Sequence, residues 1–316
     1  MISQILILSG SFLLLALAGK WLIDALSRIG VCLKLKEFVL AFFIMGIGAT
    51  IPNLIIGVVS ALKKIPELSF GDVMGASIFD LSIVVGLAAL VSRGGLSSSS
   101  RTIQGSSVFV VIISLLPIFL VFDGNLSRMD GIVLLAGFAT YVFWLFSKKD
   151  RFTKVYENCP QKFSRREIFK DVFTIFTGLV LLFIGGQGVV HSATFFYETF
   201  HLPLGLIGIF VVAIGTCMPE TFFSLQAARR GHDWMILGNL MGNVVITSTF
   251  VLGIVSLITP IKIVDFSPFI IARVFLIIAV LSFFFLIKTG QKITRKEGLV
   301  LIGIYILFLI VEILTR

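Results

Sequence analysis

The sequence predicts an all-α integral membrane protein with about ten transmembrane helices, arranged as two inverted five-helix repeats. Composition is the first observation: 57% of the 316 residues are hydrophobic and only 14% are charged, with a mean hydropathy of +1.07. A soluble domain carries about 25% charged residues. Long apolar runs and a motif pair that occurs twice are the second and third observations. A bilayer is therefore the expected solvent and partner of the chain.

The apolar runs have the length of membrane spans, which need about 20 apolar residues each. The predicted spans are residues 3–23, 37–62, 68–92, 105–122, 127–147, 168–190, 203–228, 235–258, 268–288 and 297–314. The longest polar stretch separates the fifth span from the sixth. We therefore expect a first repeat at 1–147, a polar linker at 148–167 and a second repeat at 168–316.

Two pairs of motifs occur with the same spacing in both halves of the chain. Residues 46–53 (GIGATIPN) correspond to residues 213–220 (AIGTCMPE), and residues 71–80 (GDVMGASIFD) correspond to residues 238–247 (GNLMGNVVIT). The offset is 167 for both pairs (220 − 53 and 238 − 71). A constant offset through two motifs indicates one ancestral half that is present twice.

The number of helices and the positions of basic residues predict the orientation. Five spans per repeat is an odd number, so the second repeat must enter the membrane upside down. Basic residues gather in the linker and in the loops on its side, whereas the far side has few. The positive-inside rule then places the linker in the cytoplasm and both termini outside the cell membrane. The net charge of +9 reflects this asymmetry, and no nucleic-acid partner is expected.

A proline lies in the middle of the second span and of the seventh, at equivalent positions. Pro52 and Pro219 each remove a backbone donor and free a carbonyl one turn earlier. A single proline would indicate only a packed kink, which membrane helices tolerate. Two equivalent prolines in inverted repeats instead favour helix breaks that form a binding site at the midplane.

Helical spacing places polar side chains on one face of each of four spans. These faces hold Gly46, Thr50, Asn53, Gly57 and Ser60; Asp72, Ala76, Ser77 and Asp80; Ala213, Thr216, Glu220, Ser224 and Ala227; and Asn239, Asn243 and Thr247. Close helix packing accounts for the small residues. It does not account for Asp80 and Glu220, because a carboxylate at mid-membrane costs about 2.5–3.5 kcal/mol or more.

These two carboxylates indicate a site for a cation or a proton, with structural hydrogen-bonded acids as the alternative. The candidate cation-binding residues are Thr50, Asn53, Ser77, Asp80, Thr216, Glu220, Asn243 and Thr247. Direct metal ligation is expected from Asp80, Glu220 and Asn53. Lys20 and Asp24, four residues apart on the first span, are expected to pair or to extend to the membrane surface. No arrangement of nucleophile and base indicates an enzyme.

The repeated motifs resemble the alpha repeats of the cation/calcium antiporter superfamily, whose best-known members are sodium/calcium exchangers. The shared features are a Gly-x-x-x-Pro block that ends in Glu or Asn and a later Gly-(Asp/Asn)-x-x-Gly block. The resemblance covers nearly the whole chain. It implies that the second, third, seventh and eighth helices form a central site that binds calcium and sodium alternately.

The resemblance also implies a ligand set that departs from the family's pattern. The family's two helix-breaking glutamates fall on Asn53 and Glu220, and its third-helix asparagine falls on Asp80. Its eighth-helix aspartate falls on Thr247, and Cys217 replaces a serine. Asp80 and Glu220 are then the two acids that remain, where the usual site has about three.

The expected function is secondary active cation antiport by alternating access, with calcium moving against sodium or protons and no tightly bound cofactor. A charge of −2 matches one divalent ion, two sodium ions or two protons, which predicts electroneutral exchange. Proton competition is expected because burial and a neighbouring negative charge disfavour a charged carboxylate. Two alternatives stay open: a sodium, potassium or proton exchanger with no calcium step, and a membrane binding or regulatory homologue that no longer cycles. The sequence does not indicate an oligomeric state.

Overall fold

A computed structural model describes residues 1–32, 46–147, 165–263 and 267–315. The linker predicted at 148–167 and the first part of the second predicted span lie largely outside these residues. In chain order the elements are α1 (Ile2–Cys32), α3 (Gly46–Leu62), α4 (Glu67–Phe79), η2 (Asp80–Val84), α5 (Val85–Val91), β1 (Leu96–Ser97), α6 (Arg101–Leu120), η3 (Val121–Asp123), β2 (Asn125–Leu126), α7 (Arg128–Ser147), α8 (Arg165–Phe200), α9 (Leu204–Leu206), η5 (Ile207–Val212), α10 (Ala213–Arg230), α11 (Asp233–Val245), η6 (Ile246–Val251), α12 (Leu252–Ile258), β3 (Ile261–Lys262), α13 (Ser267–Gly290), β4 (Lys292–Ile293) and α14 (Arg295–Leu314).

Most of these elements join into helices that can cross a bilayer. Within the described ranges, 9 helices are long and apolar enough, and Gly46–Leu62 is a shorter apolar helix. The predicted all-α membrane class is therefore correct. The sixth predicted span was too short, because it ended at residue 190 whereas α8 continues to Phe200. Polar residues in that last part of α8 hide the end of the helix in a hydropathy profile.

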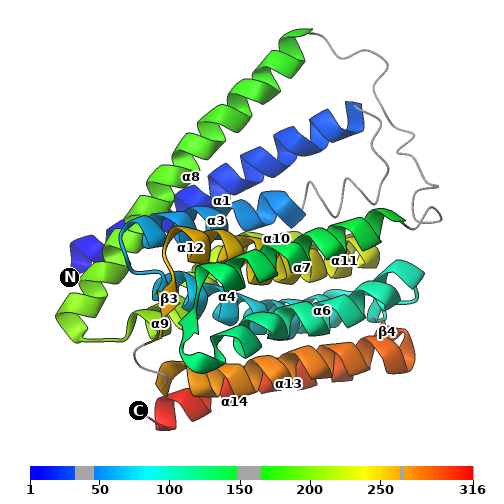
Figure 1. Ribbon diagram of the computed structural model, residues 1–316. Coiled ribbons are helices and arrows are strands. Elements are labelled where there is room, and N and C mark those ends of the chain that lie inside the picture. Colours follow the sequence, from blue (N-terminus) through cyan, green and yellow to red (C-terminus); the bar gives the residue numbers. More distant parts are fainter. Residues whose placement is uncertain (33–45, 148–164, 264–266, 316) are drawn as a thin grey trace.

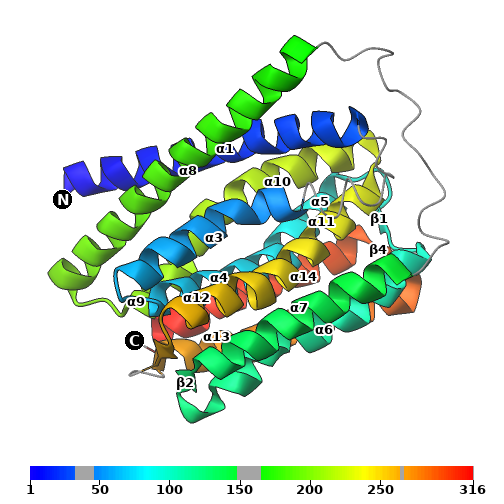
Figure 2. The same ribbon diagram turned by 45° about the horizontal axis from the view of Figure 1, so that its top comes forward.

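Two helices, α1 and α8, stand apart from the main bundle. They lie against each other and cross over the remaining helices (Figures 1 and 2). Near one end of this pair, the Arg28 guanidinium binds the Asp171 carboxylate at 2.6 Å. The other helices pack side by side in the bundle that holds most of the buried apolar residues.

Close glycine contacts between helices repeat with the offset of the sequence motifs. A Cβ added at Gly86 would lie 2.7 Å from the carbonyl oxygen of Gly298, and one at Gly253 would lie 3.1 Å from that of Gly131. Gly253 and Gly298 are equivalent to Gly86 and Gly131 (253 − 86 and 298 − 131 both give 167). Each repeat therefore makes the same backbone contact with the other, as an inverted pair of repeats requires.

The short strands pair across the two repeats as well. β1 pairs antiparallel with β4, with Leu96 opposite Ile293, and β2 pairs antiparallel with β3, with Leu126 opposite Ile261. The two pairs lie at opposite ends of the bundle (Figure 2). Both chain termini lie at the end where β2 and β3 are found (Figures 1 and 2).

Backbone also approaches backbone where α4 passes α9 and η5. A Cβ at Gly71 would lie 2.3 Å from the carbonyl oxygen of Gly205, and one at Gly75 would lie 2.2 Å from that of Ile209. Only glycine allows helices to come this close. The contact holds the polar face of α4 against the start of the helix that carries Glu220.

Candidate functional site

The polar faces of four helices meet inside the bundle. They belong to α3, to α4 with η2, to α10, and to α11 with η6. Thr50, Asn53, Ser77, Asp80, Thr216, Glu220, Asn243 and Thr247, the eight residues predicted from the sequence, are all buried, each with at most 3% of its surface exposed. Burial of this many polar groups is expensive unless they bind one another or a ligand.

The helix breaks predicted at Pro52 and Pro219 are absent, which corrects that expectation. Pro52 lies inside α3 and Pro219 lies inside α10, and both helices continue past the proline. One missing backbone donor costs a single hydrogen bond, and the helical bonds on either side of the proline are kept. The departures from α-helix are instead π-helical: η2 begins at Asp80, and η6 begins one residue before Thr247. Such insertions occur frequently at functional sites.

Asp80 and Glu220, which come from opposite repeats, converge on one amide. The Asn243 side-chain nitrogen donates to Asp80 Oδ2 at 2.7 Å and to Glu220 Oε2 at 2.7 Å. One ligand atom from each of Asp80, Glu220 and Cys217 lies within 4.8 Å of the others. In the part of the chain that the structure describes, no basic side chain pairs with either carboxylate.

Three oxygen atoms at this point have no donor among the described residues. They are Asp80 Oδ1, Glu220 Oε1 and Asn243 Oδ1, and all three are buried. A buried acceptor without a partner costs about 1–3 kcal/mol, and more when it is charged. A cation can coordinate several such oxygens at once, whereas a proton would serve at most two of them, so the acceptor set fits a cation site. Hard oxygen ligands of this kind suit sodium and calcium.

Three predicted hydroxyl ligands bind the backbone of their own helices. Thr50 Oγ1 donates to the Ile47 carbonyl at 2.9 Å, and Ser77 Oγ donates to the Val73 carbonyl at 2.8 Å. Thr247 Oγ1 donates to the Asn243 carbonyl at 2.9 Å. All three residues are buried, and a hydroxyl that donates to the backbone keeps lone pairs that can accept a hydrogen bond or bind a cation.

Asn53 and Thr216 both bind Asp72, a residue that the prediction placed on the polar face of its helix but did not count as a ligand. Asn53 Nδ2 donates to Asp72 Oδ2 at 3.0 Å, and Thr216 Oγ1 donates to Asp72 Oδ1 at 3.1 Å. Asp72 is fully buried. A signal in the sequence was available: Asp72 shares its helix face with Asp80 and occupies the position equivalent to Asn239.

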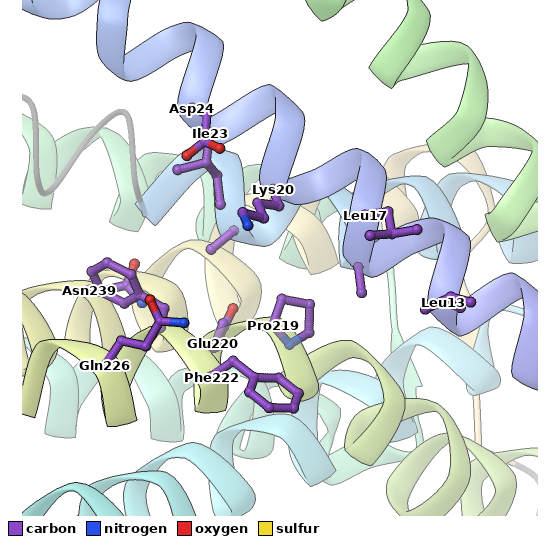
Figure 3. A pocket seen from close by; sticks show the side chains of 13 residues that line it. Leu13, Leu17, Lys20, Ile23, Asp24, Pro219, Glu220, Phe222, Gln226 and Asn239 are labelled. Atoms are coloured by element: carbon purple, nitrogen blue, oxygen red, sulfur yellow. The ribbon is translucent and has the colours of Figure 1, made fainter. Parts of the chain in front are cut away.

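A cavity of about 440 Å³ reaches Glu220 from beside α1. Lys20 and Asp24 on α1 face Pro219 and Glu220 on α10 across this space (Figure 3). The lining continues along α10 to Gln226, toward the end of the bundle at which α10 finishes. Within the described residues, Lys20 and Asp24 form no ion pair with each other. The sequence did not predict that they line a route to Glu220.

Comparison with known proteins places this arrangement in a family. The family model described as "Sodium/calcium exchanger protein" matches residues 3–147 and 170–314. A relative named "Sodium/calcium exchanger MaX1", from Methanosarcina acetivorans, is 26% identical, and the alignment covers 97% of both chains. "Inner membrane protein YrbG" from Escherichia coli is 24% identical over 87% of this chain and 86% of its own.

Solved structures agree on the fold. Structures of the sodium-calcium exchanger NCX_Mj match with a TM-score of 0.68 at 24% identity, and the match covers 97% of each chain. The family is one of exchangers, in agreement with the expectation of a transporter and not an enzyme. Because the family model matches both repeats almost end to end, this chain belongs to the sodium/calcium exchanger protein family.

Proposed function

We propose that the protein is a secondary active antiporter that moves calcium against sodium or protons through the site formed by Asp80, Glu220 and Asn243. Three buried acceptor oxygens, contributed by both repeats and without a donor among the described residues, are the observation that carries this proposal. A transported cation would supply the positive charge that no basic side chain in the described ranges places there. The family membership and the relative named as a sodium/calcium exchanger support the same function.

The cavity beside α1 is the proposed access route to the site. From Glu220 its lining continues to Asp24 on α1 and Gln226 on α10, toward the end of the bundle that carries β1 and β4, opposite the two termini (Figure 2). The loops at that end hold most of the basic residues, which assigns it to the cytoplasm. The proposed state is therefore open to the inside, in a cell membrane with both termini outside.

Ion flux into proteoliposomes tests the proposal. An outward sodium gradient should drive calcium uptake, with proton and potassium gradients as separate arms. The substitutions Asp80→Asn and Glu220→Gln should abolish uptake, because each removes a charge that the cation balances. Asn53→Ala should weaken it without abolishing it. Asp123→Asn, a change of the same type at the exposed last residue of η3, should leave uptake unchanged.

Each other outcome has a definite meaning. Full activity in all three site variants would overturn the site assignment. Sodium flux that calcium neither drives nor inhibits would indicate a sodium, potassium or proton exchanger without a calcium step. Protection of the purified protein against heat by cations, without any flux, would indicate a binding protein that no longer cycles.

A further inference from the structure

One pair of equivalent positions holds an acid and an amide in both repeats, but the acid comes first in the second repeat and last in the first repeat. The second repeat has Glu220 on α10 and Asn239 on α11. The first repeat has Asn53 on α3 and Asp72 on α4 at the equivalent positions (220 − 53 and 239 − 72 both give 167). Each repeat therefore contributes one acid from this pair of positions.

We propose that Asp72 is a third ion-binding carboxylate of the transport site, in which it replaces the acid that position 53 lacks. This inference rests on the proposed antiport function. The hydrogen bond from Asn53 Nδ2 to Asp72 Oδ2, 3.0 Å long, places the carboxylate directly against the side chain at position 53. The negative charge of the first repeat has thus moved across this contact from α3 to α4.

The surroundings of Asp72 leave its charge unbalanced. Its two oxygens accept hydrogen bonds from the neutral groups of Asn53 and Thr216. Within the described ranges no basic side chain pairs with it, and it is fully buried. Neutral donors hold a carboxylate in place but do not cancel its charge, so a cation that competes with a proton has to balance it.

A second position for a cation along the transport path follows from this geometry. Asp72 and Asp80 are eight residues apart on one helical rod, which corresponds to about 12 Å along its axis. Thr216 and Cys217, consecutive on α10, contact the two carboxylates in turn: Thr216 binds Asp72, and Cys217 lies with Asp80 and Glu220. One cation would lie between Asp72, Asn53 and Thr216, and the other between Asp80, Glu220 and Asn243.

Counting Asp72 changes the expected coupling of the exchanger. Asp80 and Glu220 alone balance two positive charges, and Asp72 adds one more. The site with Asp72 should therefore carry one more monovalent cation per cycle than the site without it. Two acids predict electroneutral exchange. With Asp72 counted as a third acid, electroneutral exchange is expected only of a variant in which Asp72 is replaced by a neutral residue.

Exchange of the two side chains tests the proposal. The variants are Asp72→Asn, Asn53→Glu and the double variant that carries both changes, which places the carboxylate where the second repeat has it. Sodium coupling is measured in proteoliposomes from the sodium gradient that just balances a fixed calcium gradient. Sodium binding is measured from the sodium concentration that protects the purified protein against heat.

Asp72→Asn is expected to move one fewer sodium ion per cycle and to bind sodium about tenfold more weakly, which is the loss of one charge-assisted contact. The double variant should recover both quantities, because it restores the carboxylate on the other side of the same contact. Asn53→Glu alone sets two carboxylates against each other and should bind sodium poorly or fold poorly. Asp171→Asn, which neutralises a buried acid outside the four site helices, should keep the coupling of the wild type.

Two results would overturn the inference. Unchanged coupling and sodium binding in Asp72→Asn would show that Asp72 has only a structural role. A folded double variant that binds sodium no better than Asp72→Asn would show that the charge cannot be exchanged between the two positions. If Asp80→Asn and Glu220→Gln lose exchange while Asp72→Asn keeps the coupling and sodium binding of the wild type, only this inference fails. If Asp80→Asn and Glu220→Gln also keep full exchange, the proposed function fails as well.

Discussion

At the residue scale, Asn243 determines how two negative charges can share one buried space. Its side-chain nitrogen donates to both Asp80 and Glu220, and its oxygen is a buried acceptor without a donor among the described residues. The side chain therefore holds the carboxylates in position and adds a third acceptor for the ion. An aspartate here would add another negative charge, and an aliphatic residue would leave both carboxylates without a donor.

Cys217 supplies a testable feature of ion selectivity. Its sulfur lies with the carboxylates of Asp80 and Glu220, and sulfur prefers soft metal ions to calcium. Cys217→Ser replaces sulfur with a hard oxygen of similar geometry. We expect the variant to shift the preference from cadmium toward calcium by about tenfold, a 1.4 kcal/mol change.

Inhibition of calcium uptake by cadmium measures this shift. Cys217→Ala serves as the control, because it removes the sulfur without adding an oxygen ligand. It should lose cadmium sensitivity and gain no calcium affinity. Equal cadmium inhibition in all three proteins would show that the sulfur does not contact the ion.

At the element scale, two site helices contain π-helical turns next to the proposed ligands, and they continue past these turns without a break. A π-helical turn adds one residue and rotates the following part of the helix. η2 and η6 do this at nearly equivalent places, beginning at Asp80 and at Ile246, one residue before the equivalent of Asp80. The sequence showed the prolines but not these turns, because π-helical hydrogen bonding has no simple residue pattern.

Equivalent glycines of the two repeats differ in how tightly they are packed, which gives a matched pair of variants. A methyl group at Gly71 would meet the Gly205 carbonyl oxygen at 2.3 Å, whereas one at Gly238 meets nothing within 4 Å. Gly71→Ala should therefore destabilise the protein by about 1–3 kcal/mol through overpacking. Gly238→Ala should be neutral or slightly stabilising, because alanine favours helix over glycine.

Thermal unfolding of the two purified variants in detergent distinguishes these effects. The wild type provides the reference, and the difference between the two alanine variants isolates the contact with Gly205. Similar unfolding temperatures for both variants would mean that α4 can move away from α9 at little cost.

At the scale of the whole molecule, inverted symmetry sets the positions of the termini. The two repeats run in opposite directions through the bundle, because each has an odd number of spans. The pairing of β1 with β4 and of β2 with β3 joins them at both ends. Both termini then lie at one end of the bundle (Figure 1).

This arrangement predicts that both termini are outside the cell. Epitope tags at residue 1 and after residue 316 should both react with antibody in intact cells. A tag inserted between Ser97 and Ser99, at the opposite end, should react only after the membrane is opened. A terminal tag that is protected in intact cells would reverse the assigned orientation, and termini on different sides would contradict the inverted repeat.

The sequence determined the membrane class, the repeated half and the two acids at its centre. The membrane class follows from the length of the apolar runs, and the repeat follows from the constant offset of 167. The two acids stand out because an apolar membrane helix does not otherwise tolerate a carboxylate. Only the tertiary structure decided which polar residues meet. Asp72 touches Asn53 from a neighbouring helix and Thr216 from the other repeat, and no spacing within one helix specifies such contacts. Close glycine crossings, such as that of Gly71 with Gly205, make such contacts possible, because they set the distance between helices that are far apart in the chain.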